Sequence, residues 1–144
     1  MISLANQDDV IRMTDLAADY FRRVGGDGTF SPKEFVSSWD LYMNSGAGFI
    51  YKRHSGMEIK EAIGVMIWHD PFDGSRVAGT IFWFAPNVAV GLAPGILFVE
   101  VEARLKKLGI KRFYPQHPVG NVDAATFLNK HGYRVRETSY SKDI

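Results

Sequence analysis

The sequence offers few side chains that could move a proton during a reaction: His117, His69, Tyr114 and Glu61. The ordinary pKa of histidine lies closest to neutral, so His117 and His69 are candidate general acids or bases. A lone histidine in a turn is also a common surface residue. Tyr114 has the alternative of lining a core or a groove. These four residues define the chemistry that the fold would have to bring together.

The absence of cysteine removes several classes of function. It excludes a disulfide framework, cysteine zinc sites and a cysteine nucleophile. Any group transfer must therefore be direct or use another side chain. The net charge of +1 gives no strong attraction to nucleic acid or to an anionic membrane. The nearest basic cluster, Lys106, Lys107, Lys111 and Arg112, flanks a predicted helix end, where cations are expected for dipole reasons.

Residues 27–35 resemble the second half of a calcium-binding EF-hand loop. Glu34 stands where the bidentate ligand would be, and Gly28 stands at the sharp turn. The first and third ligand positions, however, fall on Arg23 and Gly25, and neither supplies a side-chain oxygen. A helix-capping box explains Glu34 without a metal. We therefore expect no metal site.

Length and composition indicate a single domain over residues 1–144. A hydrophobic share of 46% and a charged share of 23% are typical of globular proteins. No apolar stretch approaches the roughly 20 residues that span a bilayer. The start of the chain has neither a basic region nor an apolar core of a signal peptide. We expect a cytoplasmic protein.

Hydrophobic periodicity predicts an α/β (α+β) fold with about four helices and a mixed, mostly antiparallel twisted sheet. The predicted order is β-α-α-β-β-β-α-β-α-β. Helices are predicted over 7–24, after the Asn6 cap; 32–45, after a Ser31 and Glu34 capping box; about 97–108; and 121–130, capped by Asn121. Strands are predicted over 2–4, 49–53, 63–68, 77–84, 110–114 and 133–140.

Two of these predictions bear on the centre of the fold. The turn sequence at 70–75 should join strands 63–68 and 77–84 in an antiparallel hairpin whose two faces are both covered. Trp68 and Trp83 should pack within it, although one could line a pocket. Helix 97–108 should carry the ion pairs Glu100–Arg104 and Glu102–Lys106.

The order of elements and a set of spaced residues resemble the GNAT superfamily of acyl-CoA-dependent N-acyltransferases. The opening strand with Asp8, Asp9 and Leu16 looks like the family's first strand and helix, and 86–109 has the spacing of its coenzyme-binding segment. The family's late pattern is matched by Asn121, Ala124, Phe127, Lys130, Gly132 and Tyr133.

Two departures from the family pattern concern function. The pyrophosphate loop of the family has a basic residue and closely spaced glycines, whereas residues 89–95 lack the basic residue. Pro94 also removes one N–H donor. Leu128 stands where many members have a tyrosine that protonates the leaving thiolate. Another acid, or solvent, must then do so. The loop has the alternative of being an ordinary strand-to-helix turn.

The resemblance implies direct transfer of an acetyl or similar group from acetyl-CoA, or another acyl-CoA, to a small-molecule or protein amine. It implies an oxyanion donor near Phe84 or Ala85, and a possible homodimer. The candidate catalytic residues are His117, which follows the fifth predicted strand close to where the thiolate would leave, and Tyr114 on that strand. The coenzyme groove would be formed by Phe84, Ala85, Gly91, Leu92, Ala93, Gly95, Ile96 and Asn121. The alternative is a GNAT fold without catalysis that works as a binding or interaction module.

Overall fold

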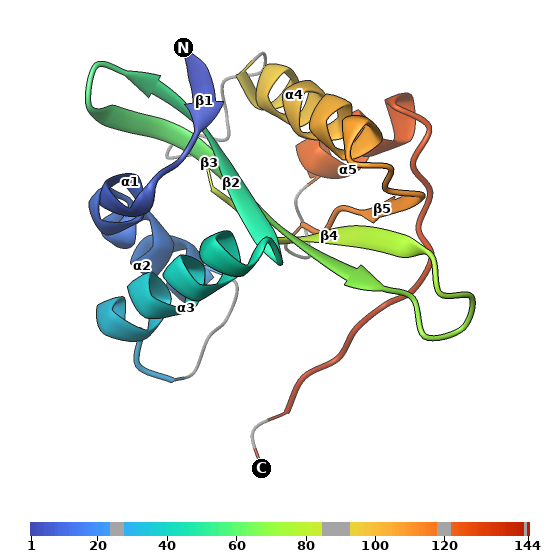
Figure 1. The fold of residues 1–144 in the computed structure, drawn as a ribbon, viewed down its shortest axis with the longest axis horizontal. Helices are drawn as coiled ribbons and strands as arrows, with labels where there is room; N and C mark the ends of the chain where they lie inside the picture. Colours follow the sequence, from blue (N-terminus) through green and yellow to red (C-terminus); the bar gives the residue numbers. More distant parts are fainter. Residues whose placement is uncertain (24–27, 85–92, 118–121, 143) are drawn as a thin grey trace.

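The computed structural model describes residues 1–23, 28–84, 93–117, 122–142 and 144. Within them the chain forms five strands and five helices (Figure 1). The strands are β1 Ile2–Leu4, β2 Gly48–Ser55, β3 Glu58–His69, β4 Arg76–Phe84 and β5 Arg112–Tyr114. The helices are α1 Gln7–Arg12, α2 Thr14–Arg23, α3 Pro32–Ser45, α4 Ala93–Lys107 and α5 Val122–Lys130.

The strands form one sheet in the order β1-β2-β3-β4-β5. The first three pairs of neighbours are antiparallel, and only β4 and β5 are parallel. The predicted hairpin is confirmed, since Trp68 pairs with Val77 and His69 with Arg76. Gly74 adopts φ +73° in the connecting turn, a backbone conformation that favours glycine. The mixed, mostly antiparallel sheet of the sequence prediction is therefore confirmed.

Helices cover both faces of this sheet (Figure 1). Helices α1 to α3 lie on one face over a core that includes Trp39, Ile50 and Phe82. Helices α4 and α5 lie on the other face over a core that includes Leu97 and Phe98. The two cores explain why β3 and β4 are apolar along most of their length, as a sheet buried on both sides requires.

The first predicted helix, over residues 7–24, is wrong as a single element, because the chain divides it into α1 and α2. Asn6 caps α1 as predicted and forms a capping box with Asp9. Met13 then leaves the helical region at φ −91° and ψ 5°, and the Thr14 hydroxyl donates to the carbonyl oxygen of Ile11. Met13 is nevertheless fully buried in the same core as Val10 and Ala17, so the predicted apolar face is kept across the break.

Helix α3 confirms the prediction from its start and stop residues. The Ser31 side chain accepts a hydrogen bond from the Glu34 N–H at 3.2 Å, and Pro32 occupies the first turn. The return bond of the predicted capping box, from the Ser31 N–H to the Glu34 carboxylate, is not formed between these two described residues. Gly46 ends the helix at φ +75°.

Two other predictions are wrong. Residues 133–140 form no strand, because Val135 and Tyr140 are both largely exposed and the polar residues between them leave no apolar face to bury. In α4 the Glu102–Lys106 ion pair is formed, but among the described residues Glu100 has no such pair with Arg104. No helix within the described residues is long and apolar enough to cross a membrane.

Candidate functional site

The candidate site begins where β4 and β5 separate. Their parallel pairing joins Val77–Gly79 to Arg112–Tyr114 and goes no further. Just beyond it, the backbone N–H of Gln116 donates to the Thr80 hydroxyl at 2.7 Å. From Ile81 to Phe84, β4 is paired only with β3 among the described residues. The β5-facing side of this stretch of β4 therefore has no strand partner.

A bulge in β4 lies at the same place. Gly64 pairs with Phe82 and Val65 pairs with Thr80, so Ile81 has no counterpart on β3. A bulge leaves one residue unpaired and increases the local twist. The Ile81 side chain is 54% exposed although both of its neighbours are buried. The bulge and the separation of the strands thus coincide, and Ile81 is the exposed residue between them.

The two predicted catalytic residues lie on the β5 side of this separation. Tyr114 ends β5 and is half-buried. Its hydroxyl accepts a hydrogen bond from Arg136, and its ring lies beside that of Trp68 with centroids 6.2 Å apart. His117 is half-buried and follows Gln116, whose backbone is bonded to β4. His69, in contrast, is exposed at the hairpin end of β3.

Helix α4 begins beyond the end of β4, and its first turn carries three predicted coenzyme residues, Ala93, Gly95 and Ile96. A Cβ on Gly95 would lie 3.1 Å from Cε2 of Phe127, so this turn packs closely on α5. Ile96 is 59% exposed. Ala93 begins the helix. The first N–H groups of a helix have no intrahelical partner, although Pro94 supplies none.

The remaining predicted coenzyme residues divide into two groups. Phe84 is buried at the end of β4, in the core under α1 to α3, and its ring lies 5.4 Å from that of Tyr20. Ala85, Gly91, Leu92 and Asn121 lie outside the described residues.

A buried glutamate stands beside the exit of β4. Glu61 lies within β3, not before it as the sequence prediction had it, and its side chain is fully buried. Its carboxylate accepts a hydrogen bond from the indole N–H of Trp83 at 3.0 Å and another from Nε of Arg53 at 3.2 Å. Burial raises the pKa of Glu61, and the bonds from Trp83 and Arg53 oppose this only in part.

This arrangement makes Glu61 a residue that positions Trp83. The Trp83 ring stacks on Phe98 with centroids 5.4 Å apart and meets the edge of Phe127 at 6.1 Å. Trp83 is thus a packing residue, as predicted, and it ties the end of β4 to α4 and α5. The sequence signal for this role was a charged residue directly before the apolar run 62–68, but nothing in the sequence pointed to its partners.

The position that departs from the family pattern is buried in the core. Leu128 on α5 is buried and belongs to the cluster beneath α4, so it serves as a packing residue. Nearby, the Tyr133 hydroxyl donates to the Glu102 carboxylate at 2.7 Å, and burial together with this contact raises the pKa of Tyr133. Within the described part of the chain, no three His, Asp or Glu residues gather as metal ligands would.

Comparison with known proteins supports the fold and leaves the activity open. No protein-family model matches the sequence, and no curated protein matches it. Solved structures do match. A predicted acetyltransferase from Clostridium acetobutylicum, solved with acetyl-CoA, superposes with a TM-score of 0.80 at 11% identity, covering 99% of this chain and 95% of the other.

Two further structures show the same architecture. A GNAT family acetyltransferase from Staphylococcus aureus gives a TM-score of 0.70 at 13% identity, over 100% of this chain and 98% of the other. A transcriptional regulator from Bacillus halodurans gives 0.81 at 16% identity, over 100% and 99%. The chain therefore has the fold of the GNAT N-acyltransferases, as its sequence predicted. At these identities the likeness concerns the fold alone.

Proposed function

We propose that this protein is an acyl-CoA-dependent N-acyltransferase that moves an acetyl or similar group directly to an amine. The observation that carries the proposal is the separation of β4 from β5 at the Ile81 bulge, next to Tyr114 and His117. It occurs in a fold shared with acetyltransferases, one of which was solved with acetyl-CoA. Where two parallel strands separate part of the way along, an extended acyl donor can bind the backbone groups that the strands leave unpaired.

The coenzyme would lie between the last residues of β4 and the start of α4. In an antiparallel pair alternate N–H groups face away from the partner strand, so part of the backbone of residues 81–84, where the predicted donor Phe84 lies, would face the thioester carbonyl. Gly95 and Ile96 lie in the first turn of α4, whose dipole and free N–H groups favour a phosphate. No acidic side chain occupies that turn to oppose an anion.

The proposed reaction needs two proton movements. The amine nitrogen attacks the thioester carbonyl carbon, the C–S bond breaks, and an amide and a thiol result. His117 takes the proton that the amine loses. The Tyr114 hydroxyl, which already accepts a bond from Arg136, keeps its own proton available for the leaving thiolate. No covalent enzyme intermediate is required.

The first experiment is thermal unfolding with and without excess acetyl-CoA. A ligand that binds only the folded protein, present at 100 times its dissociation constant, adds about 2.7 kcal/mol to the free energy of unfolding. We expect a clear rise in Tm, followed by thiol release with some member of an amine panel. No rise at millimolar acetyl-CoA would instead favour the non-catalytic interaction module.

A pair of substitutions on α4 tests the coenzyme position. Ile96→Asp places a negative charge in the first turn, where it suits the helix dipole but repels a phosphate. Val99→Asp makes the same change one turn later, at a side chain that is 51% exposed. We expect Ile96→Asp to weaken acetyl-CoA binding at least tenfold by calorimetry, and Val99→Asp to leave it nearly unchanged. Equal effects would place the coenzyme elsewhere.

The proton carrier is tested by His117→Ala and His69→Ala side by side. We expect the first to lower kcat by about 100-fold or more, the usual size of a general-base contribution, with little change in Tm. Unchanged turnover in His117→Ala would remove the assigned role. A loss of turnover in His69→Ala alone would instead assign the role of general base to His69, at the hairpin end of β3.

A further inference from the structure

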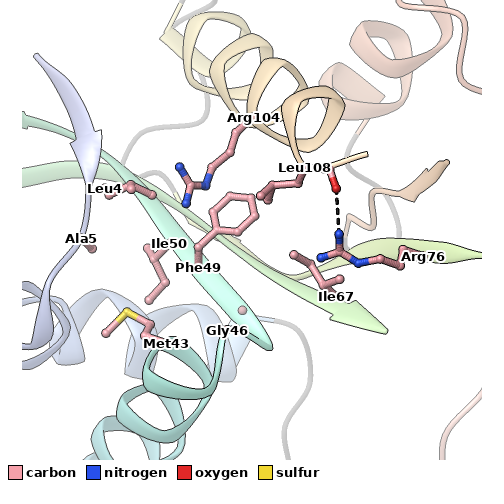
Figure 2. Close-up of a pocket in the computed structure, with 11 residues that line it drawn as sticks. Leu4, Ala5, Met43, Gly46, Phe49, Ile50, Ile67, Arg76, Arg104 and Leu108 are labelled. Atoms are coloured by element: carbon pink, nitrogen blue, oxygen red, sulfur yellow. Dashed lines mark hydrogen bonds between the residues drawn. The ribbon is translucent and has the colours of Figure 1, made fainter. Parts of the chain in front are cut away.

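A pocket of about 300 Å³ lies at the end of the sheet opposite the candidate transferase site. It is bounded by the start of β2, the start of β4 and the last turns of α3 and α4, with Leu4 of β1 at its rim. Figure 2 shows its lining side chains. The volume is at the lower end of the range for small-molecule sites. Nothing in the proposed transfer reaction uses this pocket.

Arg104 enters the pocket from α4. Its side chain points from the helix toward Phe49 and Leu4 (Figure 2), and its guanidinium carbon lies 5.2 Å from the centre of the Phe49 ring. Its Nε is buried and has no hydrogen-bond partner among the described residues. None of the hydrogen bonds or ion pairs found among the described residues uses the Arg104 guanidinium, so its terminal N–H groups, which point into the pocket (Figure 2), remain available to an acceptor there.

Arg76 supplies a second cation from the start of β4. One of its terminal nitrogens donates to the carbonyl oxygen of Leu108 at 2.8 Å, which fixes the side chain at the pocket wall (Figure 2). This contact uses only one of the five N–H donors of a guanidinium. None of the ion pairs found among the described residues involves Arg76 or Arg104. By contrast, Arg112 is paired with Asp70 and Asp73.

The rest of the lining is apolar. Among the described residues that bound the pocket there are two arginines and no carboxylate. Phe49, Ile67 and Leu108 form its walls, together with the ends of α3 and β1. A pocket with two cations and apolar walls favours a ligand that has one anionic end and one apolar end, because the anionic end then meets a cation and the apolar end meets an apolar wall.

We propose that this pocket binds a small monocarboxylate with an aliphatic or aromatic body, its carboxylate bound by Arg104, while the charge of Arg76 on the other side of Phe49 (Figure 2) adds to the positive potential of the pocket. A carboxylate suits the planar donors of a guanidinium. An inorganic dianion would be costly to bring against Phe49 and Leu108. The site is separate from the candidate transferase site, since Arg76 begins β4 and the bulge at Ile81 lies five residues further along the strand, about 17 Å at a rise of about 3.3 Å per residue.

The experiment measures binding of butyrate, hexanoate and octanoate by calorimetry at low salt, with octanamide and inorganic phosphate as comparisons. We expect affinity to rise roughly fourfold per methylene until the pocket is full, with much weaker binding of octanamide and of phosphate. Amide chemical shifts should move at Phe49 and Leu108. Excess acetyl-CoA should not displace octanoate, whether or not the protein proves to be a transferase.

Variants complete the test. Arg104→Gln should weaken octanoate binding about tenfold or more, the effect of one hydrogen bond to a charged group. Lys107→Gln, which removes one charge from an exposed position on the same helix, should not. Arg76→Gln provides a second test if Arg104→Gln fails to fold. The proposal would be overturned if octanamide bound as tightly as octanoate, or if phosphate bound and the affinity of the carboxylates did not depend on their chain length. It would also be overturned by displacement of octanoate by acetyl-CoA, or by unchanged affinity in both arginine variants.

Discussion

Replacing Glu61 by glutamine tests whether this buried carboxylate holds the end of β4 in place. The substitution keeps the shape of the side chain and removes its charge. The glutamine oxygen can still accept the indole N–H of Trp83, but its amide nitrogen then faces Nε of Arg53, and both are donors. The change therefore breaks one of the two contacts and leaves the other nearly intact.

The size of the effect follows from opposing contributions. A hydrogen bond to a charged group contributes about 1.5–3 kcal/mol to stability. Removing a fully buried charge returns part of its desolvation cost. We expect Glu61→Gln to lower the free energy of unfolding by about 2 kcal/mol at pH 7. Glu58→Gln, on the same strand but with a side chain 70% exposed, should change it by less than about 0.5 kcal/mol.

The pH dependence gives a second and more specific test. Burial raises the pKa of Glu61 above its ordinary value of 4.5, so the folded protein holds this proton more tightly than the unfolded chain does. The stability that Glu61 contributes is therefore greatest below pH 4.5 and declines as the pH rises through its folded pKa. The cost of Glu61→Gln should accordingly be larger at pH 4 than at pH 8.

Urea denaturation of the wild type, Glu61→Gln, Trp83→Phe and the double variant would measure these quantities. A coupling energy of about 0.5–1.5 kcal/mol between the two positions is expected, since they are in direct contact. No coupling would mean that Trp83 is held by Phe98 and Phe127 alone. A cost of Glu61→Gln that is larger at pH 8 than at pH 4 would refute the reasoning, because it would show that the Arg53 ion pair outweighs burial.

Two further substitutions test the packing beneath the helices. For Asp9, burial raises the pKa, but the hydrogen bond and charge of Lys52 at 2.6 Å and the hydrogen bond from the Asn6 N–H outweigh it, so the folded pKa lies below its ordinary value. The wild type should therefore lose stability as the pH falls through this lowered pKa, and Asp9→Asn should flatten the fall in Tm between pH 5 and 2. An unchanged profile would mean that other carboxylates dominate acid unfolding. Gly64→Ala would place a Cβ 2.5 Å from Cε1 of Phe82 and 2.8 Å from the Trp39 ring, so we expect a loss of about 1–3 kcal/mol in chemical denaturation. Gly28→Ala, whose Cβ would meet only Phe21 at 4.0 Å, serves as its control.

Local rules predicted most of the elements correctly. The caps Asn6 and Ser31 begin their helices, and the turn after Asp70 forms the expected hairpin, because each depends on hydrogen bonds within a few residues. The order of the elements, together with the spaced residues around them, also indicated a GNAT-like fold. Two of the predicted elements failed. A strand over 133–140 has alternating residues but no neighbouring strand, and the break between α1 and α2 at Met13 leaves no trace in the hydrophobic spacing.

The candidate site shows the same division. The sequence pointed to Tyr114, His117 and Glu61 by residue type, since few side chains in this chain can move a proton. It did not place Glu61 inside β3 beneath Trp83. It also gave no sign that the bulge at Ile81 coincides with the separation of β4 from β5. A bulge is set by the register of two strands, and register is a property of the sheet.

The sequence by itself thus determined the chemistry that is available: no thiol, few proton carriers and a run of amphipathic elements in a recognisable order. Only the tertiary structure decided which of these groups share a site. It set Arg76 and Arg104 around one pocket at the start of β4, and the Ile81 bulge near Tyr114 further along the strand. The physical reason is that helical and strand periods are local, whereas burial, strand pairing and charge proximity depend on contacts between segments far apart in the chain.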